Sequence, residues 1–87
     1  MDKKNLFSSP LHLKILKFFH ENQSSIDTPR GVATWIGEDR AKVKSALEDL
    51  VKNKILTADR AASTTGYGYT RDTALISKIE KILSSLG

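Results

Sequence analysis

Apolar residues recur at helical spacing in four stretches of the chain, and each stretch predicts a helix. The first begins at Ser9-Pro10, where serine caps free amide groups and proline suits the first helical position. We expect it to end near Asn22. Its stripe is formed by Leu11, Ile15, Phe18 and Phe19, and is widened by Leu13 and Leu16.

Two further helices follow within a few residues of each other. Asp27 or Thr28 can cap the first of these, with Pro29 at its first position, and Gly37 ends it in a tight turn. Its inward face consists of Val32, Ala33 and Ile36. The next helix is expected from about Asp39 to Asn53, because Val43, Leu47, Leu50 and Val51 repeat with a 3.6-residue period.

Shorter segments around these helices predict strands. Ser25 to Asp27 can form one strand, and Ile55-Leu56 opens a hairpin whose first strand runs to about Arg60. The tip, residues 61–65, is small and polar. The chain then returns through residues 66–70, where Tyr67 and Tyr69 alternate and so share the sheet face that covers the helices.

The two ends of the chain complete one predicted domain over residues 1–87. Residues 1–8 are expected to form a loose arm whose apolar pair, Leu6 and Phe7, docks on the body. A last helix, capped by Asp72 or Thr73, carries a long apolar stripe. That stripe contains Leu75, Ile76, Ile79, Ile82, Leu83 and Leu86.

Length and charge narrow the function classes. An 87-residue chain has room for one small core, which makes a deep, water-excluding catalytic pocket improbable. Cysteine is absent, and no run of about 18 apolar residues or secretory signal is present, so we expect a cytoplasmic protein outside the membrane. The net charge of +4 permits nucleic-acid binding without requiring it.

The sequence offers no constellation of catalytic or metal-binding residues. His12 and His20 share the first helix, with Glu21 and Asp27 as the nearest carboxylates in the sequence, and this set does not supply three ligands at convincing spacing. The Gly66-x-Gly68 pattern belongs to a hairpin and is not a nucleotide-binding loop. We therefore expect neither an enzyme nor a cofactor.

The element order helix–strand–helix–helix–hairpin–helix resembles the winged helix-turn-helix domain of prokaryotic transcriptional regulators, with the MarR-like and ArsR-like groups nearest. Val32-Ala33 with Ile36-Gly37 is similar to the family's second helix, and Val43, Leu47 and Leu50 to its recognition helix. Ile55-Leu56 and Tyr69-Thr70 match the pairs that enter and leave the wing. The resemblance implies an α+β fold with a small three-helix core, a two- to three-stranded β-wing and a C-terminal helix.

Two positions depart from the family pattern. Lys54 stands where many members have glycine before the wing. Ser45 stands where many have arginine, which removes one frequent DNA contact.

The resemblance implies double-stranded DNA as the partner, with the third helix in the major groove and the wing on the backbone. On this basis the helix is expected to contact DNA through its first two turns, the wing through its tip, and the second helix through its N-terminus. The candidate contacts are Thr28, Arg30, Arg40, Lys42, Lys44, Ser45, Arg60, Ser63 and Thr64. The alternative is that these are ordinary solvated charges, a cap and a polar turn, and that the domain is a protein–protein interaction module.

Other polar and aromatic residues have simpler interpretations. Glu48 and Asp49 would repel phosphate and are expected to pair with Lys44, Lys52 or Asn53 one turn away. Half-buried packing is expected for Trp35, with a partner surface as the alternative. The last helix could serve a homodimer as well as the domain's own core. The residues predicted for that dimer are Leu75, Ile79, Ile82 and Leu86.

Overall fold

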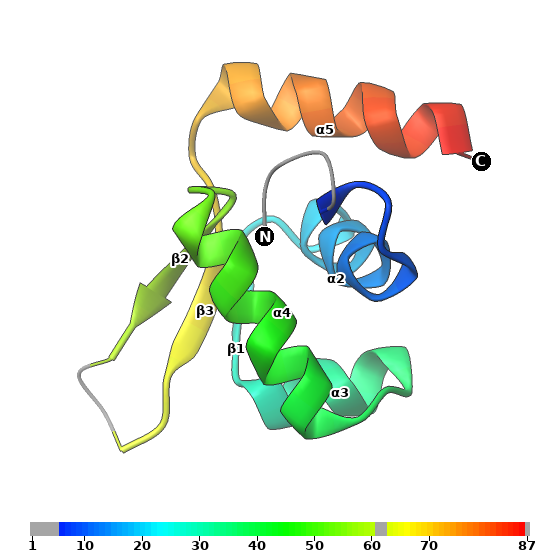
Figure 1. Ribbon diagram of the computed structural model, residues 1–87. Helices are drawn as coiled ribbons and strands as arrows, with labels where there is room; N and C mark the ends of the chain where they lie inside the picture. Colours follow the sequence, from blue (N-terminus) through cyan, green and yellow to red (C-terminus); the bar gives the residue numbers. More distant parts are fainter. Residues whose placement is uncertain (1–5, 61–62, 87) are drawn as a thin grey trace.

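The helices and strands follow the order expected from the sequence. The computed structural model describes residues 6–60 and 63–86, the side chain of Leu86 excepted. Figure 1 shows α5 at the end of the molecule opposite the hairpin tip and α3. The elements are α2 (Pro10–Glu21), β1 (Ile26–Asp27), α3 (Pro29–Ile36), α4 (Arg40–Lys52), β2 (Leu56–Asp59), β3 (Gly66–Tyr69) and α5 (Thr73–Leu86).

Side chains just outside the helices satisfy their first amide groups, as the sequence predicts for Ser9, Thr28 and Asp72. The Ser9 hydroxyl accepts from the third residue of α2 at 3.4 Å, and the Thr28 hydroxyl accepts from the third residue of α3 at 3.1 Å. Asp39 does the same for α4 at 3.0 Å, and Asp72 accepts from two amides of α5. A cap of this kind stabilises a helix by about 1 kcal/mol, so these residues fix where the helices start.

Left-handed residues follow α3 and α4. Gly37 has φ 70° after α3 and, lacking a Cβ, takes this conformation without strain. Lys54 has φ 63° after α4. The Lys54 amide donates to the Val51 carbonyl at 2.9 Å and the Ile55 amide to the Leu50 carbonyl at 3.0 Å, which is a Schellman ending. Lysine therefore occupies a backbone position that favours glycine.

The three strands form an antiparallel sheet in the order β1-β3-β2. Tyr67 and Tyr69 lie on its inner face, and both are buried. Gly66 and Gly68 alternate with them, and a Cβ on Gly66 would lie 2.9 Å from the Ile26 Cγ2 atom. Glycine at that position therefore leaves room for the Ile26 side chain against β3.

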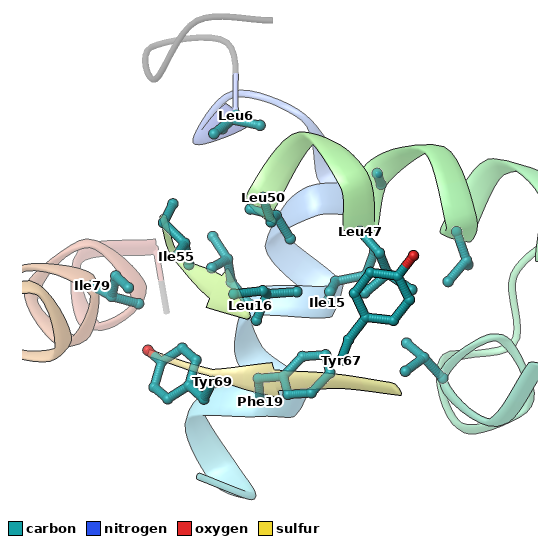
Figure 2. Packing of buried hydrophobic residues seen from close by; sticks show 14 of the residues in the cluster. Leu6, Ile15, Leu16, Phe19, Leu47, Leu50, Ile55, Tyr67, Tyr69 and Ile79 are labelled. Carbon is teal, nitrogen blue, oxygen red and sulfur yellow. The ribbon is translucent and has the colours of Figure 1, made fainter. Parts of the chain in front are cut away.

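One hydrophobic core joins both ends of the described chain. Leu6 and Ile79 are fully buried in it, and Phe7 packs against it, so the expected docking of the Leu6–Phe7 pair is confirmed. The first five residues of the predicted arm lie outside the described ranges. Figure 2 shows Tyr67 and Tyr69 on one side of β3. The other buried apolar residues are Ile15, Leu16, Phe19, Val32, Ala33, Val43, Ala46, Leu47, Leu50, Ile55 and Leu56.

The burial of Ile79 corrects the expectation that it contributes to a dimer surface on α5. Its side chain has no exposed surface, so it cannot form part of a dimer surface as the sequence suggests. Leu75 also packs against the core but is only partly buried, while Ile82 is half-buried. The inner side of α5 thus covers the core of the domain. The stripe of apolar residues left on its outer side is narrower than the sequence suggests. None of the helices in residues 6–60 and 63–86 has the length and apolar character needed to cross a bilayer.

Candidate nucleic-acid interface

A groove of about 350 Å³ lies between the start of α3, the first half of α4 and the hairpin tip. It combines side chains that are far apart in the sequence, because the Gly37 turn brings α3 against α4 and the hairpin folds back beside them. Its lining residues are Pro29, Arg30, Arg40, Ala41, Lys44, Ser63, Thr64, Thr65 and Tyr67.

Five of the nine predicted contact residues meet in this groove. Arg30, Arg40 and Lys44 supply positive charge, and Ser63 and Thr64 supply hydroxyl groups. All five are exposed. Within the described part of the chain, none of the three cations takes part in an ion pair. The groove therefore presents unneutralised cations beside hydrogen-bond donors, an arrangement that attracts an anionic backbone.

The other four predicted residues lie elsewhere. Lys42 and Ser45 are exposed on α4 but do not line the groove. Thr28 is half-buried, and its hydroxyl already accepts the Gly31 amide. Its place in the structure matches the capping role that the sequence offered as an alternative. Arg60 is engaged by Glu48, as described next.

Glu48 is surrounded by donors from both strands of the hairpin. Arg60, directly after β2, donates from Nη1 to Glu48 Oε2 at 2.9 Å and from Nη2 to Oε1 at 2.7 Å. The Tyr67 hydroxyl in β3 donates to the same Oε2 atom. These bonds, with that of Arg60 the stronger, lower the pKa of Glu48 from its ordinary value of 4.5 to about 2. Burial, followed by the bond to Glu48, raises the pKa of Tyr67.

The hydrogen-bonded partners of Glu48 and Asp49 differ from those predicted, although the charge of Lys44 is among the causes that lower the pKa of Glu48. Neither carboxylate forms an ion pair with a lysine one turn away in α4. Glu48 pairs with Arg60, and Asp49 Oδ2 lies 3.0 Å from the His12 Nε2 atom. The wing supplies the partner of Glu48, and α2 supplies a buried partner, His12, for Asp49.

Ser9, His12 and Asp49 form a hydrogen-bonded row that the sequence did not reveal. His12 Nδ1 lies 2.7 Å from Ser9 Oγ, and the other ring nitrogen, Nε2, is bonded to Asp49. His12 is only 6 % exposed. The row joins the start of α2 to the middle of α4, and its members do not line the groove between α3, α4 and the hairpin tip. We assign it to packing between the two helices.

Trp35 lies in a different place from the one predicted. The expected half-buried packing is wrong, because Trp35 is 74 % exposed. The inward side of α3 is occupied by Val32, Ala33 and Ile36. Trp35 instead lies beside Phe18, with ring centroids 6.4 Å apart. Both line a second groove of about 710 Å³ between α2, β1 and α3.

Thr65, which the sequence offers as a hydrogen-bond donor beside Ser63 and Thr64, also lines the first groove. Three other lining residues were not singled out in the sequence as contacts, namely Pro29, Ala41 and Tyr67. Pro29 and Ala41 lie next to predicted residues in the helices, so neighbourhood alone could have identified them. Tyr67 was assigned to packing, which its full burial confirms, and its hydroxyl bonds to Glu48 in α4. No group of three or more His, Asp or Glu side chains in the described ranges is placed to hold a metal ion.

Solved structures place this arrangement among known folds. A homodimeric winged helix-turn-helix DNA-binding domain from Mycobacterium bovis, a possible ArsR-family regulator, superposes with a TM-score of 0.72 at 14% identity, covering 93% of this chain and 74% of that one. The fold is a winged helix-turn-helix. In these terms α3 and α4 form the helix-turn-helix, and β2 and β3 form the wing.

Two other winged-helix neighbours agree. Lactococcus lactis ZitR, solved in complex with DNA, has a TM-score of 0.60 at 20% identity, covering 85% of this chain and 56% of that one. A transcriptional regulator from Thermotoga maritima has a TM-score of 0.64 at 18% identity, covering 97% and 66%. The chain thus spans just over half to three quarters of these neighbours' lengths. Neither a protein-family model nor a curated protein matches the sequence.

Proposed function

We propose that this winged helix binds double-stranded DNA as a transcriptional regulator. The first two turns of α4 enter the major groove, and the tip of the wing lies along the backbone. The observation that carries the proposal is the groove in which Arg30, Arg40 and Lys44 lie beside Ser63 and Thr64. The fold shared with DNA-binding regulators supports it.

Each cation in the groove has a distinct expected task. Arg40 is the first residue of α4, and an arginine there can grip guanine O6 and N7 with two hydrogen bonds. Lys44 lies one turn further along, where a lysine more often holds phosphate. Arg30 is in the first turn of α3, whose free amide groups also favour an anion. Lys42, Ser45 and Thr28 remain candidates at the edge of this surface.

A regulator of this kind acts by binding and needs no catalytic step. It would work in the cytoplasm, where bacterial DNA is located, and two copies would read two half-sites about one helical turn apart. The outer stripe of α5, with Leu75 and Ile82, is the proposed dimer surface, and the side chain of Leu86, predicted for the same surface, lies outside the described part of the structure. The homodimeric state of the Mycobacterium bovis domain supports that part of the proposal.

The test is a fluorescence-anisotropy titration of duplex DNA at several salt concentrations. Micromolar binding that weakens steeply with salt is expected, since each neutralised phosphate adds about 0.9 to the slope of log K against log salt. Arg40→Ala and Lys44→Ala should both weaken binding. Lys78→Ala, an equal charge change on the exposed surface of α5, should not. If all three variants lost the same amount of DNA affinity, the effect would be one of net charge alone, and the groove would be rejected as the DNA-binding surface.

One observation favours a second candidate, a protein-interaction module. Ile26 and Trp35 are the large hydrophobic residues found exposed in the described ranges, at 71 % and 74 %, and they line the same groove as Phe18. Exposed apolar residues gathered in one groove are typical of partner surfaces. Absence of DNA binding even at low salt, with a partner whose binding is lost in Trp35→Ala, would favour this candidate.

A further inference from the structure

Arg60 and Tyr67, from the two sides of the wing, bond to one carboxylate of α4, that of Glu48. Both strands of the wing contribute to this attachment, because Arg60 follows β2 directly and Tyr67 belongs to β3. We call Glu48, Arg60 and Tyr67 the Glu48 cluster. We propose that Glu48 is a positioning residue that fixes the wing against α4, and that Arg60 serves Glu48 rather than DNA phosphate. The DNA part of this inference rests on the function proposed above.

The geometry of the cluster restricts the wing in orientation as well as distance. Two parallel N–H···O bonds between a guanidinium and a carboxylate fix the planes of both groups. Tyr67 adds a third bond from a ring that is fully buried in the core. Because the ring is held in the core, its hydroxyl fixes the position of the Glu48 carboxylate relative to β3.

The cluster lies on both sides of the wing tip in the sequence. Arg60 precedes the tip and Tyr67 follows it, so the segment between them leaves and returns at anchored points. Ser63 and Thr64 in that segment line the groove opposite Arg40 and Lys44. The separation between the tip hydroxyls and the cations of α4 is therefore set by Glu48.

Two features separate Arg60 from the predicted DNA contacts. Both of its terminal nitrogens are bonded to Glu48, and it does not line the groove. Release of Arg60 to phosphate would leave an uncompensated carboxylate one turn from Lys44. Paired, the two charges cancel next to the groove, and the cations of α4 keep their attraction for an anion.

The positioning role can be measured without DNA. Amide hydrogen exchange is followed in the full chain for the wild type, Glu48→Ala, Arg60→Ala and Arg60→Lys. Arg60→Lys keeps the charge but loses the two-point geometry. In all three variants the amides of β2 and β3 should exchange about tenfold faster than in the wild type, the scale of one charge-assisted hydrogen bond. The amides of α2 should be unchanged.

Glu21→Ala is the matched control for this measurement, because it removes an exposed carboxylate from a helix outside the cluster. It should leave exchange in β2 and β3 as in the wild type. Wild-type exchange rates in β2 and β3 of Glu48→Ala and Arg60→Ala would overturn the positioning role. Retained protection in Arg60→Lys alone would also overturn it, since charge without the two-point geometry would then suffice.

The role of Arg60 toward DNA is decided by the salt dependence of affinity. Arg60→Ala and Arg60→Lys should both weaken binding while the slope of log K against log salt stays at the wild-type value. Lys44→Ala should reduce that slope by about 0.9, as expected for a lost phosphate contact. A reduction of the same size in Arg60→Ala would show a direct contact and overturn the inference.

Failure of the proposed function has a separate signature. If the wild-type chain binds no duplex at any salt concentration, DNA binding is rejected. The exchange rates of β2 and β3 then decide the positioning role by themselves.

Discussion

The His12 ring and the Asp49 carboxylate join α2 to α4 across 37 positions of the sequence, at a distance of 3.0 Å. His12 is buried, and Ser9 occupies the other ring nitrogen. Both nitrogens of a buried ring are thus satisfied, which buried polar groups require. The contact also holds the helix that carries the candidate DNA surface against the helix at the centre of the core.

Asp49→Ala should destabilise the fold by about 1–3 kcal/mol, because it leaves a buried ring nitrogen without a partner. Asp49→Asn should cost less, since its amide oxygen can still accept from His12. Urea denaturation followed by circular dichroism measures both. Glu21→Ala, on an exposed helix surface, should stay within about 0.5 kcal/mol of the wild type. An equal loss for Asp49→Ala and Glu21→Ala would show that the contact contributes nothing.

Acid should weaken the fold through Glu48. Its pKa is about 2 in the folded chain and 4.5 by default, so the folded state favours the ionised form. The resulting stability is fully present above pH 4.5 and is lost as the pH falls toward 2. In Glu48→Gln this part of the pH dependence should disappear. Denaturation midpoints at a series of pH values check this, and parallel curves for the two proteins would contradict it.

Lys54→Gly should stabilise the domain. A left-handed residue with a Cβ costs about 1–2 kcal/mol, and glycine removes that cost. Glycine also loosens the unfolded chain, which returns about 0.4–1 kcal/mol. A net gain of about 0.5–1 kcal/mol is expected from these opposing effects. Lys52→Gly, in the last turn of α4, should instead destabilise, and a loss in both variants would mean that Lys54 is not strained.

Trp35 and Leu47 should respond very differently to truncation. Leu47 is fully buried, so Leu47→Ala should cost about 2–5 kcal/mol through the cavity it leaves. Trp35→Ala removes a larger side chain but should cost only about 0.5 kcal/mol, because most of that side chain is in water. Tryptophan fluorescence gives a second measurement. Its emission should resemble that of tryptophan in water, and strong shielding from iodide would show that Trp35 is covered.

Local chemistry made the element boundaries predictable from the sequence. Ser9, Thr28 and Asp72 were among the caps expected from the sequence, because a cap acts on amides two or three residues away. The start of α4 followed from apolar periodicity instead, and its cap, Asp39, was expected inside the helix. The alternation of Tyr67 and Tyr69 predicted a buried face for the same kind of reason. Each of these inferences needs only a few neighbouring residues.

Contacts between distant residues were not predictable in the same way. Glu48 and Arg60 are 12 positions apart, and their pairing depends on the angle at which the hairpin returns to α4. The exposure of Trp35 depends on how little of the surface around α3 is covered, which periodicity does not report. The grouping of five candidate contact residues in one groove could be predicted only because the family resemblance gave the three-dimensional arrangement of the helices and the wing. Which of them touch DNA stays a prediction.

Leu6 and Ile79 are buried in the same core, so the domain depends on residues from both ends of the described chain. Residues near both ends of the described chain hold the same set of side chains in place, so removing either opens a cavity under α2 and α4. The fold should therefore unfold in a single cooperative step. A peptide of α3 and α4 alone would lack the surroundings that set the angle between its two helices. The groove lined by Arg30, Arg40 and Lys44 therefore cannot be excised as a working fragment.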